Sequence, residues 1–230
     1  MQSSPFDEYA ENYDAVLAQG LAISGEDSSY FARQRVLWLR DCHHQLGEQP
    51  RAILDYGCGN GSTVPLLHEL LEAESVVGLD ASATCIERAH QTHGSERSRF
   101  LLIDGYRPTA QVDLAYCNGV FHHVPVSKRD QVIADIAQTL RPGGLFALWE
   151  NNPLNPGTRY VMSRIPFDRD AITLKSAETR RRLETGGFQI LQTHFLFIFP
   201  KALSWLRWME PFVSGLPLGA QYLVLGRKHP

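Results

Sequence analysis

The stretch ILDYGCGNGST, residues 53–63, constrains the fold of this chain more than any other. Its apolar start is typical of a buried strand, and Gly57, Gly59 and Gly61 follow at alternate positions. Glycine-rich loops directly after a strand hold nucleotide-like ligands. The stretch therefore predicts a strand that ends in a ligand-binding loop, and the neighbouring residues must decide the class of ligand.

Strands and amphipathic helices alternate from residue 51 onward. Apolar strands are predicted at 52–56, 75–80, 99–104, 112–119 and 145–150. Such alternation indicates right-handed βαβ units and a parallel sheet that is covered on both faces. Two further strands, at 188–199 and 219–228, fit a final hairpin. The predicted fold is a Rossmann-like, doubly wound α/β fold with a mostly parallel seven-stranded sheet, an antiparallel C-terminal hairpin and an N-terminal helical lid.

The first fifty residues precede the sheet. Residues 30–46 are expected to form a helix, because their apolar side chains recur at helical spacing. We interpret residues 1–50 as a helical lid over the carboxyl ends of the strands, where open α/β sheets bind their ligands. Residues 51–230 then form the ligand-binding domain, and the segment at 151–175 is expected to be a loop on the substrate side.

Composition argues against several classes of function. The net charge of −3 disfavours nucleic acid as a partner, because phosphate binding uses clustered Lys and Arg. The four cysteines form no C-x-x-C pair and no signal peptide is recognised, so free thiols and a cytoplasmic location are expected. The histidine doublets at 43–44 and 122–123 lack carboxylates or cysteines at metal-site spacing, so no metal is expected. No apolar run approaches the roughly 20 residues of a membrane span.

The spacing of the glycines favours one class of ligand over another. A dinucleotide fingerprint is G-x-G-x-x-G, whereas Ser62 occupies its third glycine position here and the pattern is G-x-G-x-G. Asp55, at the end of the first strand, would repel a pyrophosphate but attract an ammonium or a sulfonium group. The residues therefore favour a cationic ligand over a dinucleotide.

This pattern resembles motif I of the class I S-adenosylmethionine-dependent methyltransferases, which reads hydrophobic-hydrophobic-Asp-x-Gly-x-Gly-x-Gly. The match covers Ile53, Leu54, Asp55 and the three glycines. The resemblance implies S-adenosyl-L-methionine as the cofactor, and it extends to residues at the ends of other strands. The positions that it assigns to the cofactor are Tyr13, Asp55, Gly57, Gly59, Gly61, Asp80, Ala81, Asp104, Gly105, Asn118 and Gly119.

The resemblance gives each strand end its own part of the cofactor. Asp80 is expected to accept hydrogen bonds from both ribose hydroxyls, as acids at this position do in the dinucleotide folds. Asp104 and Gly105 are expected to lie at the adenine amino group. Asn118 and Gly119 are expected to lie beside the methionine part of the cofactor.

Two further segments indicate a small-molecule acceptor. FDEYAENYDA, residues 6–15, resembles the entry segment of small-molecule methyltransferases of the quinone-biosynthesis type, in which a tyrosine, here Tyr13 or Tyr9, closes over the cofactor. After the fourth strand, the chain lacks the Asn/Asp-Pro-Pro-aromatic motif of enzymes that methylate nucleic-acid bases.

Three residues are candidates for catalysis. His122 and His123 follow the fourth strand, and Glu150 ends the fifth, so all three are expected beside the transferred methyl group. A base speeds methylation of an oxygen acceptor that is not ionised, on the order of 10²–10⁴-fold. We therefore favour O-methylation, and N- or C-methylation stays open. In the family such histidines often shape the pocket without proton chemistry, and that alternative also stays open.

Residues 150–174 resemble a bacterial subgroup of methyltransferases that has Glu-x-Asn-Pro-x-Asn-Pro and Pro-Phe-Asp-x-Asp-Ala motifs. The arginines of this segment either bind an anionic substrate or pair with neighbouring acids. These arginines are Arg159, Arg164 and Arg169, and the acids are Asp168 and Asp170.

Four interpretations of the function remain after this comparison. The first is methylation of a small molecule by an S-adenosylmethionine-dependent enzyme. The aromatic segment at 195–212 keeps a lipid-linked or glycolipid acceptor open, because such a segment can face a lipid surface. A nicotinamide-dependent oxidoreductase and a non-catalytic protein that binds a nucleotide cofactor are the alternatives from other classes. The acceptor and the oligomeric state cannot be predicted.

Overall fold

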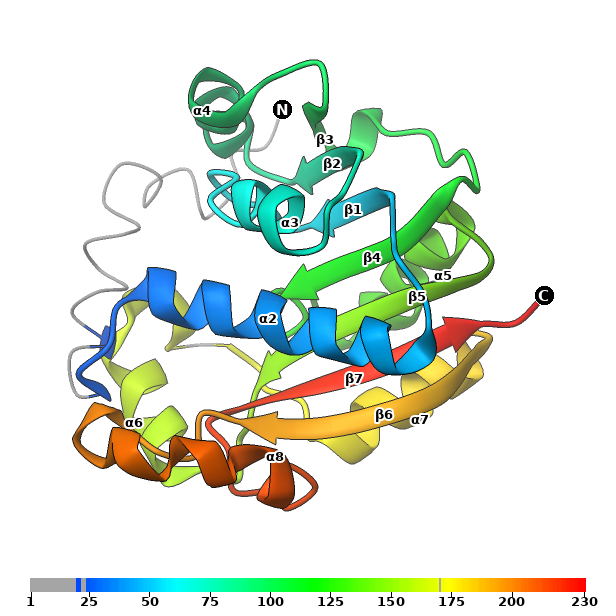
Figure 1. The fold of residues 1–230 in the computed structure, drawn as a ribbon. Helices are drawn as coiled ribbons and strands as arrows, with labels where there is room; N and C mark the ends of the chain where they lie inside the picture. The colour runs from blue at the N-terminus through cyan, green and yellow to red at the C-terminus, as the bar shows by residue number, and fades with distance from the viewer. Residues whose placement is uncertain (1–19, 22–23, 170) are drawn as a thin grey trace.

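Seven strands form one mixed sheet in the order β3-β2-β1-β4-β5-β7-β6. The structure, a computed structural model, describes residues 20–21, 24–169 and 171–230. The strands are β1 (Ala52–Tyr56), β2 (Ser75–Asp80), β3 (Ser98–Leu102), β4 (Val112–Asn118), β5 (Leu140–Asn151), β6 (Phe188–Leu196) and β7 (Gln221–Lys228). The strands β1 to β5 pair with one another in parallel. β7 runs antiparallel to both of its neighbours, β5 and β6. The predicted Rossmann-like sheet with an antiparallel C-terminal hairpin is confirmed (Figure 1).

Helices cover both faces of this sheet. One face carries α2 (Ser28–Leu46), α3 (Val64–Leu70) and α4 (Ala83–His93), and the other carries α5 (Arg129–Thr139) and α7 (Ser176–Thr185). Two further helices are α6 (Pro156–Arg164) and α8 (Glu210–Val213). Short 3-10 segments whose bounds lie within the described residues are η2 (Ile103–Gly105), η3 (Val126–Lys128), η4 (Pro166–Asp168) and η5 (Lys201–Met209).

Alternate strand residues build two apolar cores, one on each face of the sheet. Ile53 belongs to the core that contains residues of α2, α3 and α4, and Leu54 belongs to the core that contains residues of α5 and α7. Because side chains of a strand point alternately to opposite faces, a strand covered on both faces must be apolar at nearly every position. The run at 52–56 shows this pattern, and Asp55 is the one acid in it.

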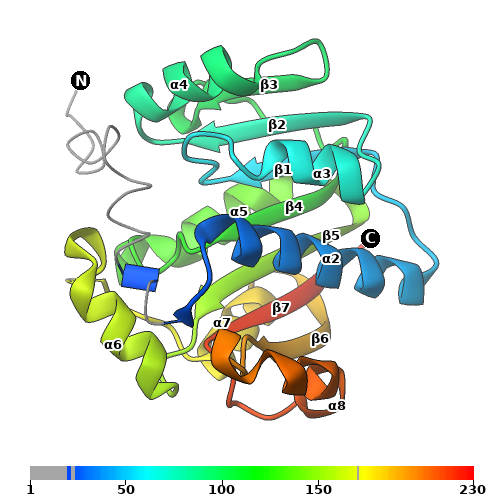
Figure 2. The ribbon, with the colours of Figure 1, turned by 60° about the vertical axis from the view of Figure 1, so that its left-hand side comes forward.

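The helix α2 lies along one face of the sheet (Figures 1 and 2). Its residues Val36 and Leu39 are fully buried in the same core as Leu114 and Leu223. The apolar face of this helix is stabilised when it packs on the sheet. It would remain exposed to water if the helix lay over the strand ends. We expected residues 1–50 to cover the carboxyl ends, and the part of them described as α2 does not. The boundary at residue 50 stays a prediction, and residues 1–19 lie outside the described residues.

The segment at 151–175 is more ordered than the sequence suggested. Its prolines indicated a loop, but Pro156 begins α6, and the Asn155 side chain accepts a hydrogen bond from the Thr158 N–H at 3.0 Å. Proline fits the first turn of a helix because its missing N–H has no partner there in any case. Figures 1 and 2 show α6 beyond the end of β5, so this helix lies at the carboxyl edge of the sheet. Its place on the substrate side stays a prediction.

No helix in the part of the chain that the structure describes is both long and apolar enough to cross a membrane.

Candidate active site

The glycine loop lies between the ends of the two strands that flank β1. β1 pairs in parallel with β2 on one side and with β4 on the other. Tyr56, the last residue of β1, lies opposite Leu79 in β2 and opposite Cys117 in β4. Each of these two residues directly precedes the polar residue that ends its strand, Asp80 in β2 and Asn118 in β4. The loop that follows Tyr56 is therefore flanked by a carboxylate and an amide. This is the topological switch point of the sheet, where open α/β folds bind ligands.

The backbone of the loop requires its glycines. Gly57, Gly59 and Gly61 have φ values of 77°, 53° and 76°. A Cβ at Gly57 would clash with the side chain of Val120, whereas a Cβ at Gly59 would meet nothing within 4 Å. Gly57 therefore allows the loop to pack against the turn after β4, and the space beside Gly59 is open to a ligand.

Asp80 fixes the loop from the side of β2. Its Oδ2 accepts a hydrogen bond from the Gly59 N–H at 2.9 Å, and its Oδ1 accepts one from the Ser82 N–H at 2.9 Å. The carboxylate is only partly buried. Asp80 is thus held beside the open space at Gly59, which is the position expected for a ribose contact.

Asp55 and Asn118 present buried acceptors on the other side of the loop. Asp55 is 3% exposed, and neither its Oδ2 nor the Asn118 Oδ1 has a hydrogen-bond partner among the described residues. Burial raises the pKa of Asp55 to about 7, the charge of Asp80 adds to the rise, and Arg35 opposes it. Buried acceptors without partners are costly. The ammonium group of S-adenosylmethionine carries several N–H donors that would satisfy such acceptors, so the residues present fit this cofactor.

The remaining cofactor residues lie along the same edge. Ala81 is exposed directly after β2. Asp104 and Gly105 form the exposed turn η2 after β3. Gly119 has a φ of 68° and donates its N–H to the Trp149 carbonyl at 3.0 Å. The predicted contact Tyr13 lies outside the described residues. The strand order therefore brings the described candidates to one edge, and their individual contacts with the cofactor stay predictions.

Glu150 holds the histidine doublet from the end of β5. Its Oε1 accepts a hydrogen bond from the Phe121 N–H at 2.7 Å, and its Oε2 pairs with the His122 Nδ1 at 2.6 Å. The Glu150 and His122 side chains are 0% and 3% exposed. Gly119, a predicted cofactor contact, lies close to the His122 ring. A Cβ added at Gly119 would be 3.6 Å from the His122 Cε1. Both oxygens of Glu150 thus serve to orient the turn and its first histidine.

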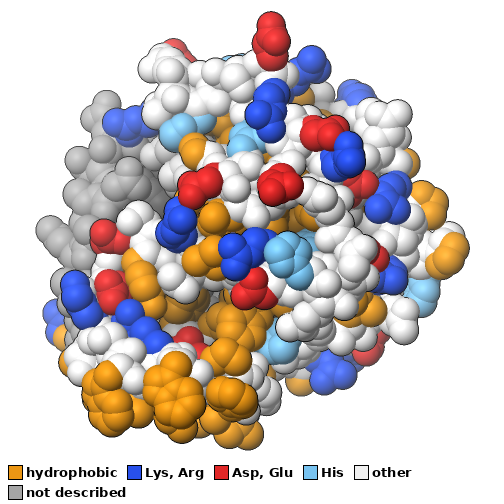
Figure 3. Space-filling model, viewed as in Figure 1, with side chains coloured by type: hydrophobic (Ala, Val, Ile, Leu, Met, Phe, Trp, Pro, Cys, Tyr) orange, Lys and Arg blue, Asp and Glu red, His pale blue; other side chains and the backbone are white. Residues whose placement is uncertain are grey.

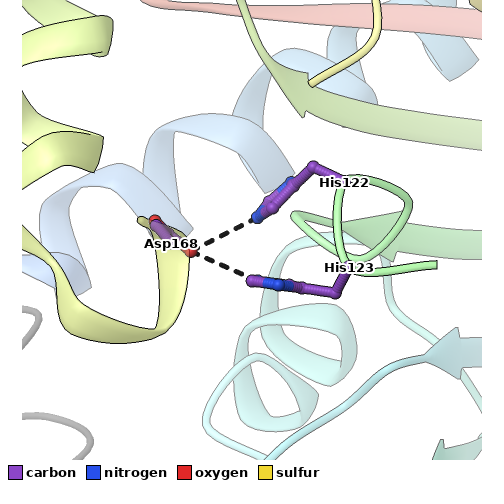
Figure 4. Close-up of side chains that lie close together, drawn as sticks. All are labelled: His122, His123 and Asp168. Carbon is purple, nitrogen blue, oxygen red and sulfur yellow. Dashed lines mark ion pairs between the residues drawn. The ribbon is translucent and has the colours of Figure 1, made fainter. Parts of the chain in front are cut away.

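Asp168 faces both histidines from η4 (Figure 4). Its Oδ1 lies 3.4 Å from the His122 Nε2 and 3.2 Å from the His123 Nε2. The Asp168 side chain is 7% exposed and that of His123 is 19% exposed. His122 therefore stands between two carboxylates, while His123 is the more accessible of the two rings.

These contacts set the protonation of the cluster. Burial lowers the pKa of His122, but the charges and hydrogen bonds of Glu150 and Asp168 outweigh it and raise the pKa to about 10. Burial likewise tends to raise the pKa of Asp168, and its hydrogen bonds to both histidines outweigh this and hold the pKa below its usual value. With this pKa, the His122 ring carries both of its protons at neutral pH and donates hydrogen bonds to the carboxylates. His122 can act as the predicted base only after one of these protons has left.

Sequence analysis did not select Asp168 as a site residue. It was considered only as a partner for the arginines of its own segment, yet among the described residues its ion pairs join it to the two histidines. Arg164 instead stacks over the Tyr160 ring, with its Cζ 5.1 Å from the ring centroid. The signal was weak because the partners are far apart in the sequence, and only the fold brings η4 beside the turn after β4.

The comparisons with known proteins agree with this geometry. Residues 53–144 match the family described as methyltransferase domain. The fold, the glycine loop and this match support the prediction of a class I S-adenosylmethionine-dependent methyltransferase with S-adenosyl-L-methionine as its cofactor. The predicted enzyme class and cofactor are confirmed, which sets aside the nicotinamide-dependent alternative.

The individual relatives share less than 30% of their residues with this chain. Trans-aconitate 2-methyltransferase of Rhodopseudomonas palustris (strain BisB5) is 24% identical over 189 residues, which cover 74% of this chain and 73% of that protein. The protein of the same name from Variovorax paradoxus (strain S110) is 28% identical over 196 residues, which cover 74% of each chain. A S-adenosylmethionine-dependent methyltransferase from Thermotoga maritima has a solved structure with a TM-score of 0.66 at 17% identity, and 97% of each chain is covered.

Proposed function

We propose that this enzyme transfers a methyl group to an oxygen atom of a small molecule that binds between the turn after β4 and the segment α6–η4. The observation that carries the proposal is the buried chain Glu150–His122–Asp168, whose histidine lies close to Gly119. Such a chain can bind and orient a hydroxyl group, and His122 can receive its proton once it has lost one of its own.

The cofactor supplies a methyl group on a sulfonium, which leaves by in-line displacement and needs no protein nucleophile. The residues of the chain then act by orientation and by exclusion of water, and orientation alone contributes up to roughly 7–11 kcal/mol in favourable cases. Asp55 and Asn118 would orient the methionine part of the cofactor. The histidines and Asp168 would orient the acceptor on the opposite side of the methyl group.

The charge of the acceptor can be argued from the same cluster. Glu150 and Asp168 are two buried carboxylates, and no arginine forms an ion pair with either within the described ranges. A tricarboxylate such as trans-aconitate would meet them with like charge. We therefore propose a neutral hydroxylated acceptor, which differs from the substrate in the name of the curated relatives.

Methyl transfer from labelled S-adenosylmethionine to a panel of acceptors tests this proposal. The panel contains phenols, sugar hydroxyls, aliphatic alcohols, amines and trans-aconitate, and mass spectrometry with NMR locates the methyl group. Methylation of a hydroxyl supports the proposal. Transfer to trans-aconitate or to amines alone would refute it.

A lipid-linked acceptor is a second candidate, supported by an exposed aromatic surface. Trp205, Trp208 and Phe212 are 70%, 68% and 81% exposed. Trp205 and Trp208 lie in η5 and Phe212 lies in α8. Apolar side chains gather at the lower left of Figure 3, in the region where Figure 1 labels α8. Aromatic side chains at such density are typical of surfaces that enter the membrane interface.

Sedimentation with vesicles of phosphatidylcholine and phosphatidylglycerol separates the two candidates. A lipid-linked acceptor predicts that the enzyme sediments with the vesicles and that the double variant Trp205→Ser, Trp208→Ser does not. Leu101→Ser is the control, because Leu101 is 41% exposed on β3, away from this surface. Equal recovery in the supernatant with and without vesicles would leave only the soluble acceptor.

A further inference from the structure

We propose that His122, His123 and Asp168 form a binding site for one divalent transition-metal ion, of which Zn²⁺ is the type. Each residue offers one ligand atom, and the three atoms lie within 4.8 Å of one another. Figure 4 shows the two imidazole rings side by side, both directed at the same carboxylate. The three residues come from two segments that only the fold brings together.

The distances between the ligand atoms suit a metal ion. The Asp168 Oδ1 lies 3.4 Å from the His122 Nε2 and 3.2 Å from the His123 Nε2. Zn²⁺ binds nitrogen and oxygen ligands at about 2.0–2.2 Å, and two such ligands at a tetrahedral angle lie about 3.4 Å apart. The two rings are also close to each other, with centroids 4.1 Å apart. An ion between the three atoms therefore requires only small adjustments of the side chains.

Glu150 provides the outer contact that metal-binding histidines typically have. Its Oε2 holds the His122 Nδ1 at 2.6 Å and its Oε1 accepts the Phe121 N–H at 2.7 Å. A histidine that donates one ring N–H to a carboxylate has its other nitrogen oriented as a ligand. His122 is thus oriented to bind a metal through Nε2, with the ion taking the place of the proton that Nε2 donates to Asp168.

The charge of the cluster also favours a cation. The Glu150 and Asp168 side chains are 0% and 7% exposed, so two carboxylates lie out of water within one small cluster. Burial of carboxylates is costly unless cations or donors compensate their charge. A divalent ion bound to Asp168, and to the histidine that Glu150 holds, would provide that compensation.

The donor set identifies the class of ion. Two imidazole nitrogens and one carboxylate oxygen suit zinc and its neighbours among the transition metals, whereas Mg²⁺ and Ca²⁺ prefer all-oxygen sites. Three protein ligands leave at least one coordination position open, as in catalytic zinc sites. On the proposed function, that position would take the acceptor oxygen and make it more acidic.

The sequence predicts no metal, because neither histidine doublet has carboxylates or cysteines at metal-site spacing along the chain. Asp168 is remote from the doublet in sequence, so a spacing rule misses it. The doublet at 43–44 offers a matched comparison within the same chain, since His44 is exposed and the structure records no carboxylate ion pair for it among the described residues.

Calorimetric titration of the full, untagged chain with ZnCl₂, without cofactor or acceptor, tests the site. We expect one ion per chain in the wild type and in His44→Ala, and at least a 100-fold loss of affinity in His123→Ala and in Asp168→Asn. Glu150→Gln should retain the ligands and lose about 10- to 100-fold in affinity, because it alters only the outer contact. Circular dichroism of each variant verifies its fold, and Co²⁺ in place of Zn²⁺ reports nitrogen and oxygen ligands by its d–d absorption.

Two results would overturn the proposal. One is the absence of Zn²⁺, Mn²⁺ and Co²⁺ binding to the folded wild-type chain. The other is binding that persists unchanged in folded His123→Ala or Asp168→Asn. Because the titration contains neither cofactor nor acceptor, its outcome is independent of whether the enzyme methylates oxygen. Chelation with EDTA in the methyl-transfer assay then tests the role of the ion separately.

Discussion

Replacing Asp55 with asparagine is expected to stabilise the cofactor-free enzyme at pH 8 and to weaken its affinity for the cofactor. The Asp55 carboxyl is 3% exposed and its pKa is raised to about 7 by burial, with Asp80 adding to the rise. A folded-state pKa above the unfolded value means that ionisation opposes folding. The penalty is absent below the unfolded pKa of about 4, grows as the pH rises, and is complete above about 7.

The magnitude follows from the shift. From 3.8 to about 7 is roughly three pKa units, which at about 1.4 kcal/mol each amounts to about 4 kcal/mol of destabilisation at pH 8. Asparagine removes this penalty but places amide donors in the same buried position, at a cost of about 1–3 kcal/mol. The free energy of unfolding of Asp55→Asn should therefore exceed that of the wild type by about 1–3 kcal/mol at pH 8. Near pH 4 the sign should reverse, because the ionisation penalty of the wild type is gone while the amide cost of the variant remains.

The cofactor should respond in the opposite direction. A charge-assisted hydrogen bond to the ammonium group contributes about 1.5–3 kcal/mol, so Asp55→Asn should bind S-adenosylhomocysteine about 10- to 150-fold more weakly. Because the ionised carboxylate is the binding form, the wild-type affinity should rise with pH through about 7, and the variant should lack this rise.

Urea unfolding at pH 4.5 and pH 8 and calorimetry with S-adenosylhomocysteine provide the two measurements. Asp135→Asn, at an exposed position of α5, is the control and should change neither quantity. The reasoning is refuted if Asp55→Asn is less stable than the wild type at pH 8, or if its cofactor affinity is unchanged.

Three further predictions concern the same edge of the sheet. Asp80→Ala should weaken S-adenosylhomocysteine binding by about 1–3 kcal/mol in calorimetry, because a ribose contact and the anchor of the loop are lost, and unchanged affinity would remove the assignment. Gly57→Ala should destabilise the fold in urea, since its Cβ meets Val120 at a positive φ; Val120→Ala should restore part of the loss, and a fully stable Gly57→Ala would contradict the loop geometry. Glu150→Gln should lower kcat while the dissociation constant of S-adenosylhomocysteine stays the same, because Glu150 positions His122 and does not touch the cofactor; equal falls in both would indicate a structural defect.

Much of the fold could be predicted because its strands are covered on both faces. A run such as AILDY is apolar enough to be identified as a strand, and the alternation with helices fixes the parallel order. The cofactor edge was also predictable, since the acid and the glycines are adjacent in the sequence. Secondary structure in the proline-rich segment after β5 was harder to predict. The helix α6 was missed because Pro156, which begins this helix, was interpreted as a loop residue.

Long-range contacts could not be predicted from one sequence. The position of α2 on the sheet face depends on which apolar surfaces are left to cover once the strands have paired. The pairing of Asp168 with His122 and His123 depends on the path of the chain after β5, and the sequence between them does not encode that path in any local pattern. The residues missed are therefore those whose role depends on tertiary contacts.

The structure of the enzyme bound to S-adenosylhomocysteine tests the central claim most directly. The account predicts the ribose hydroxyls on the Asp80 carboxylate, the ammonium group within hydrogen-bond distance of Asp55 or Asn118, and the sulfur directed toward His122 and His123. A ligand bound elsewhere, or one whose ribose and ammonium group contact none of these three polar residues, would contradict it.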